Sequence, residues 1–172
     1  MAIPQADILR FESMASTRKS FEIIKEAKAG RKQTAFLCHS HKDARLAKSV
    51  QAFLQSTGWE VYIDWDDSTM PDRPNQETAS RIQGTIKDLN WFLFLATQNS
   101  MDSRWCPWEI GYADGVKPHD SILVIPTSDY TGTHGNEYLG LYRHINPDKT
   151  GRYAVFRPDG NGVWMASLKP IV

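Results

Sequence analysis

Short apolar runs alternate along the chain with stretches in which apolar residues recur every three or four positions. Four runs are short, rich in apolar residues and predict strands: 34–38, 59–64, 91–96 and 121–126. Helical spacing appears between them, for example at Thr78, Ile82 and Ile86. Strands that alternate with helices predict right-handed crossovers and a mostly parallel sheet with helices on both faces. The predicted fold class is therefore α/β.

Two helix starts bear on the chemistry considered below. One helix follows Asp43, which suits an N-cap, and ends near Gly58. The other begins shortly after Ser103, where Pro107 fits a first helical turn because its missing N–H costs nothing there. Either Ser103 or Cys106 caps this second helix, and the sequence does not decide between them.

The two ends of the chain depart from the alternation. Residues 1–33 are predicted to be a helical extension, in which Ser16 or Thr17 caps a helix that runs to about Ala29, with Phe21 and Ile24 on its apolar side. Near the other end, the turn residues 159–162 separate two short runs and predict a hairpin. The predicted organisation is an extension over 1–33, core motifs over 34–126 and edge elements over 127–172, the last two forming one domain, 34–172.

Composition and charge narrow the class of protein. The 172 residues are 41% apolar and 23% charged, and 20 basic residues balance 20 acidic ones. Neither nucleic acid nor an anionic membrane is therefore an expected partner. The longest apolar run, Trp91–Ala96, is far too short to span a bilayer, and Met1–Arg10 lacks the pattern of a secretory signal. With only Cys38 and Cys106, a disulfide framework is not expected, and the cytoplasm is the expected compartment.

Polar segments follow three of the predicted strands. They are 39–43, 64–75 and 97–105. Because ligands bind beyond the carboxyl ends of the strands in open α/β sheets, these segments predict one site at one edge. His39 and His41 stand one residue apart, but no second cluster lies at zinc-ligand spacing, so no metal site is predicted. The glycine-rich, nucleophile-elbow and HExxH motifs of common nucleotide-binding, hydrolytic and zinc enzymes are absent from the sequence.

The segment Ser103–Glu109 carries the most specific signal. If its helix starts early, Trp105 and Glu109 lie one turn apart on one face. A carboxylate beside an indole is partly desolvated, which raises its pKa and strengthens its field on a developing cation. The alternative from the residues alone is that Glu109 only favours the positive end of the helix dipole. Trp65 and Trp105 lie at the predicted site edge and could stack on an aromatic ring of a ligand.

Four boxes in order resemble the Toll/interleukin-1 receptor (TIR) domain family. They are Phe36–Asp43 (FLCHSHKD), Val61–Asp64 followed by a polar loop with Pro71, Trp91–Thr97, and Ser103-x-Trp105 with Glu109 four residues on. The last resembles the S-x-W-x-x-x-E motif of TIR domains that cleave NAD. Two departures are visible: Cys38 and His39 replace the usual Ser-Tyr, and Pro71-Asp72 replaces the Pro-Gly pair of the BB loop.

This resemblance implies a flavodoxin-like three-layer fold with a mostly parallel five-stranded sheet, and cleavage of the nicotinamide–ribose bond of NAD. Glu109 then takes the catalytic position. NAD is the substrate, and no cofactor is implied. An oxocarbenium-like ribose needs one well-placed carboxylate, and the cationic nicotinamide leaves without a general acid. The residues expected to bind substrate are Phe36, His39, Ser40, Asp64, Trp65, Ser103 and Trp105.

The resemblance also bears on partners and alternatives. The segment Asn136–Arg143 and the C-terminal hairpin look like bacterial TIR proteins of antiphage defence, Thoeris-type systems included. These make a signalling nucleotide from NAD, so a separate effector that senses the product is expected, as is self-association through TIR–TIR contacts. Hydrolysis and cyclisation both remain open. The alternatives are a non-enzymatic TIR scaffold and, more remotely, a nucleoside deoxyribosyltransferase-like enzyme.

Overall fold

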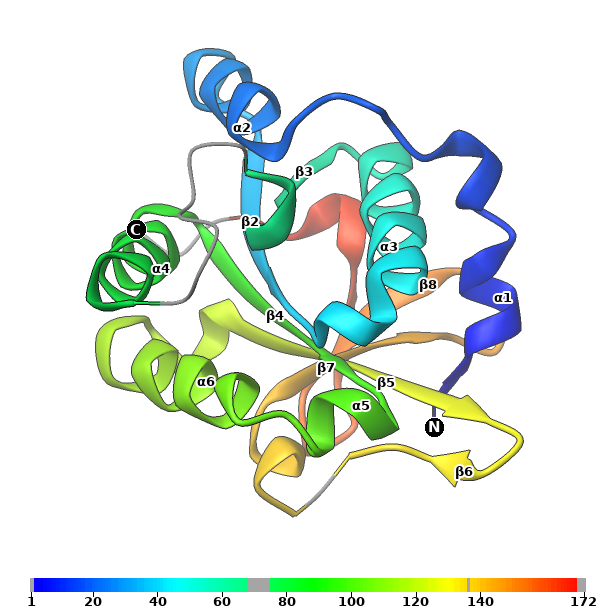
Figure 1. Cartoon of the computed structure of the whole chain (residues 1–172). Helices are drawn as coiled ribbons and strands as arrows, with labels where there is room; N and C mark the ends of the chain where they lie inside the picture. The colour runs from blue at the N-terminus through cyan, green and yellow to red at the C-terminus, as the bar shows by residue number, and fades with distance from the viewer. Residues whose placement is uncertain (1, 68–74, 136, 170–172) are drawn as a thin grey trace.

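Five parallel strands form the centre of the sheet, in the order β3-β2-β4-β5-β7 (Figure 1). The computed structural model describes residues 2–67, 75–135 and 137–169. The five strands are β2 (Gln33–Cys38), β3 (Trp59–Tyr62), β4 (Trp91–Ala96), β5 (Ile122–Asp129) and β7 (Arg143–Pro147). The α/β class and the flavodoxin-like parallel core are confirmed.

Short strands enlarge the sheet beyond the predicted five. The C-terminal hairpin, β8 (Tyr153–Phe156) and β9 (Gly162–Trp164), is confirmed, and it continues the sheet antiparallel from β7. Near the far end of β5, β1 (Ile3–Pro4) pairs parallel and β6 (Gly132–Thr133) antiparallel. The sheet thus has nine strands within the described residues. The sequence prediction missed β7 because buried polar residues such as Asn146 interrupt its apolar pattern.

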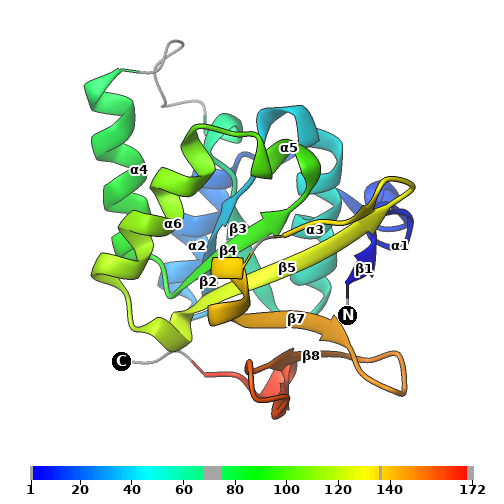
Figure 2. The same cartoon turned by 90° about the horizontal axis from the view of Figure 1, so that it is seen from below.

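Helices cover both faces of the sheet (Figures 1 and 2). Along β2, Ala35 and Leu37 face one apolar cluster, whereas Phe36 and Cys38 face the other. This alternation is the period of a strand buried on both sides. The larger helices that cover the faces are α3 (Ala44–Ser56) on the first, and α4 (Gln76–Asp88) and α6 (Trp105–Val116) on the second.

The N-terminal residues pack on the same sheet. Ile3 and Ile8 belong to the apolar cluster of α3 and are almost fully buried. Two helices lie here, α1 (Gln5–Leu9) and α2 (Ser20–Ala29), and α2 runs along the edge strand β3. The division of the chain at residue 33 stays a prediction.

The start and the apolar side of α2 differ from the prediction. The helix begins at Ser20, so neither Ser16 nor Thr17 is its N-cap. Ser20 is buried, and its hydroxyl bonds to Asp66 and to the backbone of Ile63. Phe21 is 49% exposed, whereas Ile23, Ile24 and Ala27 are the buried apolar residues. The predicted apolar side is therefore confirmed for Ile24 and wrong for Phe21.

Short helical segments complete the structure. They are the 3-10 turns η1 (Glu12–Met14), η2 (His41–Asp43), η3 (Asp64–Asp66), η4 (His119–Ser121), η5 (Glu137–Leu141) and η6 (Met165–Ser167), and the helix α5 (Gln98–Met101). Over the described parts of the chain, no helix is both long and apolar enough to cross a membrane.

One carboxylate ties two strand ends together. Asp43 occupies the N-cap position of α3, but its side chain does not cap that helix. Its oxygens instead accept hydrogen bonds from Thr97 Oγ1 at 2.5 Å and from Asn99 Nδ2 at 2.6 Å. The polar segments after β2 and β4 are therefore fastened to each other, as the predicted convergence requires.

Candidate active site

A cavity of about 290 Å³ opens at the carboxyl ends of β2 and β3, beside the start of α6. It is lined by His39, Ser40, His41, Lys42, Asp64, Thr78, Ile82, Ser103, Trp105 and Glu109. The three predicted polar segments all contribute, so the prediction that they converge is confirmed. The size lies at the lower end of small-molecule pockets, which suits part of a dinucleotide rather than all of it.

The first turn of α6 explains the Ser-x-Trp-x-x-x-Glu spacing. Arg104 occupies the N-cap position of the helix, so neither Ser103 nor Cys106 is its N-cap. Ser103 Oγ nevertheless accepts hydrogen bonds from Trp105 N at 3.2 Å and Cys106 N at 3.3 Å in the first turn. Pro107 lies in the first turn, as predicted. Trp105 and Glu109 follow one turn apart, and both line the cavity.

Glu109 is the buried acid of the cavity. The residue is 4% exposed, and within the described residues no basic side chain forms an ion pair with it. Burial raises the pKa of the Glu109 carboxyl well above its usual range, and the negative charge of Asp64 raises it further. The nearby thiol of Cys38 acts in the opposite direction and lowers this pKa. A cation placed in the cavity would therefore interact strongly with this group.

Asp64 and His41 form a polar pair at the cavity. His41 Nε2 lies 3.3 Å from Asp64 Oδ2, and the His41 side chain is largely exposed. Burial pushes the pKa of Asp64 upward, but the hydrogen bond with His41 and the nearby imidazoles outweigh it, so the pKa is lowered overall. The same hydrogen bond raises the pKa of His41.

His39 is held in one protonation state by its neighbours. The Trp65 indole N–H donates to His39 Nε2 at 2.6 Å, and because an indole nitrogen only donates, Nε2 is the acceptor. Nδ1 therefore carries the proton and donates to the carbonyl of Leu37 at 2.9 Å. Burial lowers the pKa of His39, which is consistent with a neutral ring.

Two residues predicted to bind substrate do not line the cavity. Phe36 is fully buried in the core, where its ring lies against those of Tyr62 and Phe92. This side chain points into the α4–α6 layer because it alternates with the neighbouring strand residues. Trp65 contacts His39 edge-on and donates a hydrogen bond to it; its side chain is 38% exposed but is not among those that line this cavity. Direct contact is therefore wrong for the buried Phe36, whereas substrate contact by Trp65 stays a prediction.

Four lining residues were missing from the predicted set. His41 and Lys42 belong to the polar segment 39–43 that the sequence did single out. Their basic side chains at the predicted site edge were the signal that could have identified them. Thr78 and Ile82 lie on α4, where their helical spacing indicated only a core-facing side. The approach of α4 to the strand ends is a tertiary arrangement that periodicity does not reveal.

Comparison with known families identifies the fold. The sequence model of the TIR domain matches residues 35–146, which is well over half of the chain. The chain belongs to the TIR domain family. Every residue that lines the cavity lies inside the matched range, whereas α1, α2 and the β8–β9 hairpin lie outside it.

Two curated proteins are similar to this TIR protein. The chain is 36% identical over 113 residues to a probable 3′ cyclic ADP-D-ribose synthase, ThsB′, of Bacillus cereus (strain MSX-D12). It is 27% identical over 81 residues to a putative cyclic ADP-D-ribose synthase of Cytobacillus dafuensis. The matches cover 64% and 45% of this chain, and 58% and 21% of the two relatives. The chain thus matches less than two thirds of either relative's length.

Two further predictions concern other parts of the TIR domain. The BB-loop residues Pro71 and Asp72 lie outside the described residues. Across residues 2–67, 75–135 and 137–169, no three His, Cys, Asp or Glu side chains gather as a metal site would require.

Proposed function

We propose that this TIR protein cleaves the nicotinamide–ribose bond of NAD and that Glu109 is the catalytic carboxylate. The observation that carries the proposal is a buried acid without a basic ion-pair partner among the described residues, at a cavity that Trp105 shares. Both relatives are named as cyclic ADP-D-ribose synthases, which agrees with NAD chemistry.

The charges around the cavity suit an oriented dinucleotide. NAD has a cationic nicotinamide ring at one end and an anionic diphosphate in its middle. Glu109 and Asp64 would face the cationic end and the ribose, while Lys42 and His41 would face the diphosphate. Trp105, which is 38% exposed, offers a ring face for stacking at the entrance.

Bond cleavage in this site needs few groups. The electron pair of the C–N bond leaves with the nicotinamide, which becomes neutral, and positive charge develops on the ribose. Ionised Glu109 stabilises that charge and can accept hydrogen bonds from the ribose hydroxyls. Because the approaching cation favours the ionised carboxylate, substrate binding would lower the raised pKa of Glu109 and ready it for the step.

The second half of the reaction decides the product. Capture of the ribose cation by water gives ADP-ribose, whereas capture by a nucleophile of the same molecule gives a cyclic ADP-ribose. We propose cyclisation as the main outcome, because both relatives bear the name of cyclic ADP-D-ribose synthases. Hydrolysis is the competing outcome. A role in antiphage immunity, self-association and a separate effector stay predictions.

The test is product analysis after incubation of concentrated protein with NAD, by chromatography and mass spectrometry. Wild-type protein should release nicotinamide with a cyclic ADP-ribose, and Glu109→Gln should lose at least about a thousandfold in rate. Asp88→Asn, an exposed acid on α4, is the control and should retain activity. Equal rates for Glu109→Gln and wild type would contradict the assignment of Glu109.

The alternatives give different results in the same experiment. A TIR scaffold would release no nicotinamide at any protein concentration, although it would still associate with other TIR domains. A deoxyribosyltransferase-like enzyme would instead convert deoxynucleosides, which can be offered in parallel.

A further inference from the structure

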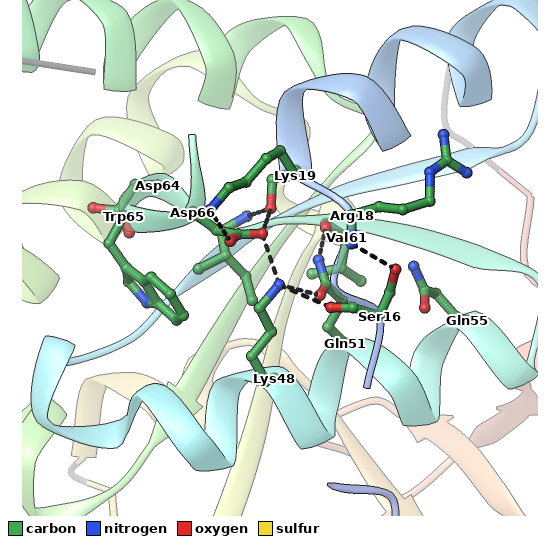
Figure 3. A network of polar contacts seen from close by, with 12 residues as sticks. Ser16, Arg18, Lys19, Lys48, Gln51, Gln55, Val61, Asp64, Trp65 and Asp66 are labelled. Atoms are coloured by element: carbon green, nitrogen blue, oxygen red, sulfur yellow. Dashed lines mark hydrogen bonds and ion pairs between the residues drawn. The ribbon is translucent and has the colours of Figure 1, made fainter. Parts of the chain in front are cut away.

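A polar network lies behind the cavity, where α3 meets the start of α2 and the η3 turn (Figure 3). Its centre is Asp66, whose side chain is only 5% exposed. Lys48 Nζ lies 2.7 Å from Asp66 Oδ2, and Ser20 Oγ donates to the same oxygen at 3.1 Å. Lys19 Nζ lies 3.6 Å from the other carboxylate oxygen. The Ser20 hydroxyl also accepts a hydrogen bond from Ile63 N at 3.1 Å, immediately before the turn.

The Lys48 ammonium connects three parts of the chain. Besides Asp66, it donates to Gln51 Oε1 at 3.1 Å and to the carbonyl of Ser16 at 3.5 Å. All three of its donors are therefore in use. Gln51 Nε2 in turn donates to the carbonyl of Val61 at 2.7 Å, which holds β3 against α3. The network thus fixes the end of β3 from behind.

Three consecutive residues of η3 face different surroundings. Asp64 lines the cavity, Trp65 donates to His39, and Asp66 is anchored in the network. Figure 3 shows the Trp65 indole and the Asp66 carboxylate leaving the turn in different directions. Lys48 Nζ also lies 5.8 Å from the centroid of the Trp65 ring. Since one short turn carries all three side chains, a shift of its anchor would shift the cavity wall.

From this arrangement we propose that Lys48 and Asp66 are positioning residues of the NAD site, whose buried pair holds Asp64 and Trp65 in the geometry that cleavage requires. Neither Lys48 nor Asp66 lines the cavity, so they act through the turn and not on the substrate. The proposal rests on the proposed function. It also gives residues that precede the TIR match over 35–146 a part in building the site.

The decisive variant removes both charges of the pair. Lys48→Met alone would leave Asp66 buried without its nearest cation and is expected to be unstable. The double variant Lys48→Met/Asp66→Asn leaves no unpaired buried charge and keeps the side-chain sizes similar. The matched control is Glu12→Gln/Arg45→Met, which removes an exposed ion pair that also joins α3 to the N-terminal segment.

The activity measurement compares kcat and KM for NAD at neutral pH. The double variant should fold, yet kcat should fall by about tenfold or more, with a smaller change in KM. The control should stay within about twofold of wild type. Lys48→Arg, which keeps a cation opposite Asp66, should retain a higher kcat than the double variant. A folded double variant with the wild-type kcat would overturn the proposal.

A second measurement does not depend on turnover. The ring ¹⁵N shifts of His39 should show the Nδ1–H tautomer in wild type at neutral and mildly acidic pH. In the double variant, a looser Trp65 should let His39 sample the other tautomer and titrate closer to its ordinary pKa. Identical His39 signals in both proteins would refute the positioning role. If wild-type protein cleaves no NAD, the proposed function fails. The ¹⁵N shifts of His39 still decide whether the Lys48–Asp66 pair positions Trp65 and His39.

Discussion

Two of the buried acids, Asp66 and Glu109, differ in the partners that surround their carboxylates. Asp66 and Glu109 have the same exposed fraction, 4%. Asp66 forms an ion pair with Lys48 and accepts a hydrogen bond from Ser20. Glu109 instead lines the cavity together with a second acid, Asp64, and no basic side chain of the described residues pairs with it.

This difference distinguishes a structural acid from a reactive one. A buried carboxylate that has a cation and a hydroxyl donor as partners is satisfied, and its negative charge is already compensated within the protein. A buried carboxylate that lacks a cation interacts strongly with any positive charge that enters, because little water screens it. The exposed fraction does not distinguish Glu109 from Asp66. The groups that contact each carboxylate do.

The largest expected effect is on stability and concerns Asp66, the buried acid that has a cation as partner. Lys48→Met should lower the free energy of unfolding by about 3 kcal/mol, because it leaves a buried carboxylate without its nearest cation. Lys48→Met/Asp66→Asn should recover most of that loss. Urea unfolding at neutral pH measures both. A single variant as stable as wild type would mean that the pair is not energetically coupled.

The next effect is a gain in stability when the charge of Glu109 is removed. Because burial raises the pKa of Glu109 in the folded state, stability is lost as the pH rises from the unfolded pKa through the folded one. Glu109→Gln should therefore be more stable than wild type at neutral pH by about 1–2 kcal/mol. The two proteins should converge below the ordinary glutamate pKa. Thermal unfolding across a pH series would reveal a gap that fails to close in acid, which would contradict the linkage.

The pH dependence of NAD cleavage sharpens the role of the cavity charges. Glu109 must be ionised, so kcat/KM should rise with pH through a pKa above the ordinary 4.5 of a glutamate. The hydrogen bond with Asp64 raises the pKa of His41 above 6.5, so kcat/KM should fall again as His41 loses its charge at higher pH. His41→Asn should remove the alkaline limb and leave the acidic one. Loss of both limbs would refute this assignment.

The smallest effect tests the thiol beside Glu109. The nearby Cys38 thiol lowers the pKa of the Glu109 carboxyl, against the larger effect of burial. Cys38→Ala should therefore move the acidic limb of kcat/KM upward by about half a pH unit. Cys38→Ser, which retains a donor, should move it less. An equal shift in the two variants would show that the thiol acts by packing instead.

Much of the site could be foreseen from local patterns. The polar segments after the strands, the early start of α6 and the one-turn spacing of Trp105 and Glu109 all follow from short-range rules of strand and helix formation. Phe36 and Trp65 could not be placed in this way. Their motif positions suggested contact with substrate, but the facing direction of a strand residue and the packing of a turn depend on distant neighbours.

The sequence by itself determined the α/β class, the family and the identity of the buried acid, because each depends on periodicity or on residues at fixed spacing. Only the tertiary structure decided that α4 forms a wall of the cavity, that Trp65 fixes the protonation of His39, and that the N-terminal residues brace η3 through Asp66. These contacts join segments far apart in the chain. Their geometry comes from how the layers pack, and no local pattern of residues encodes it.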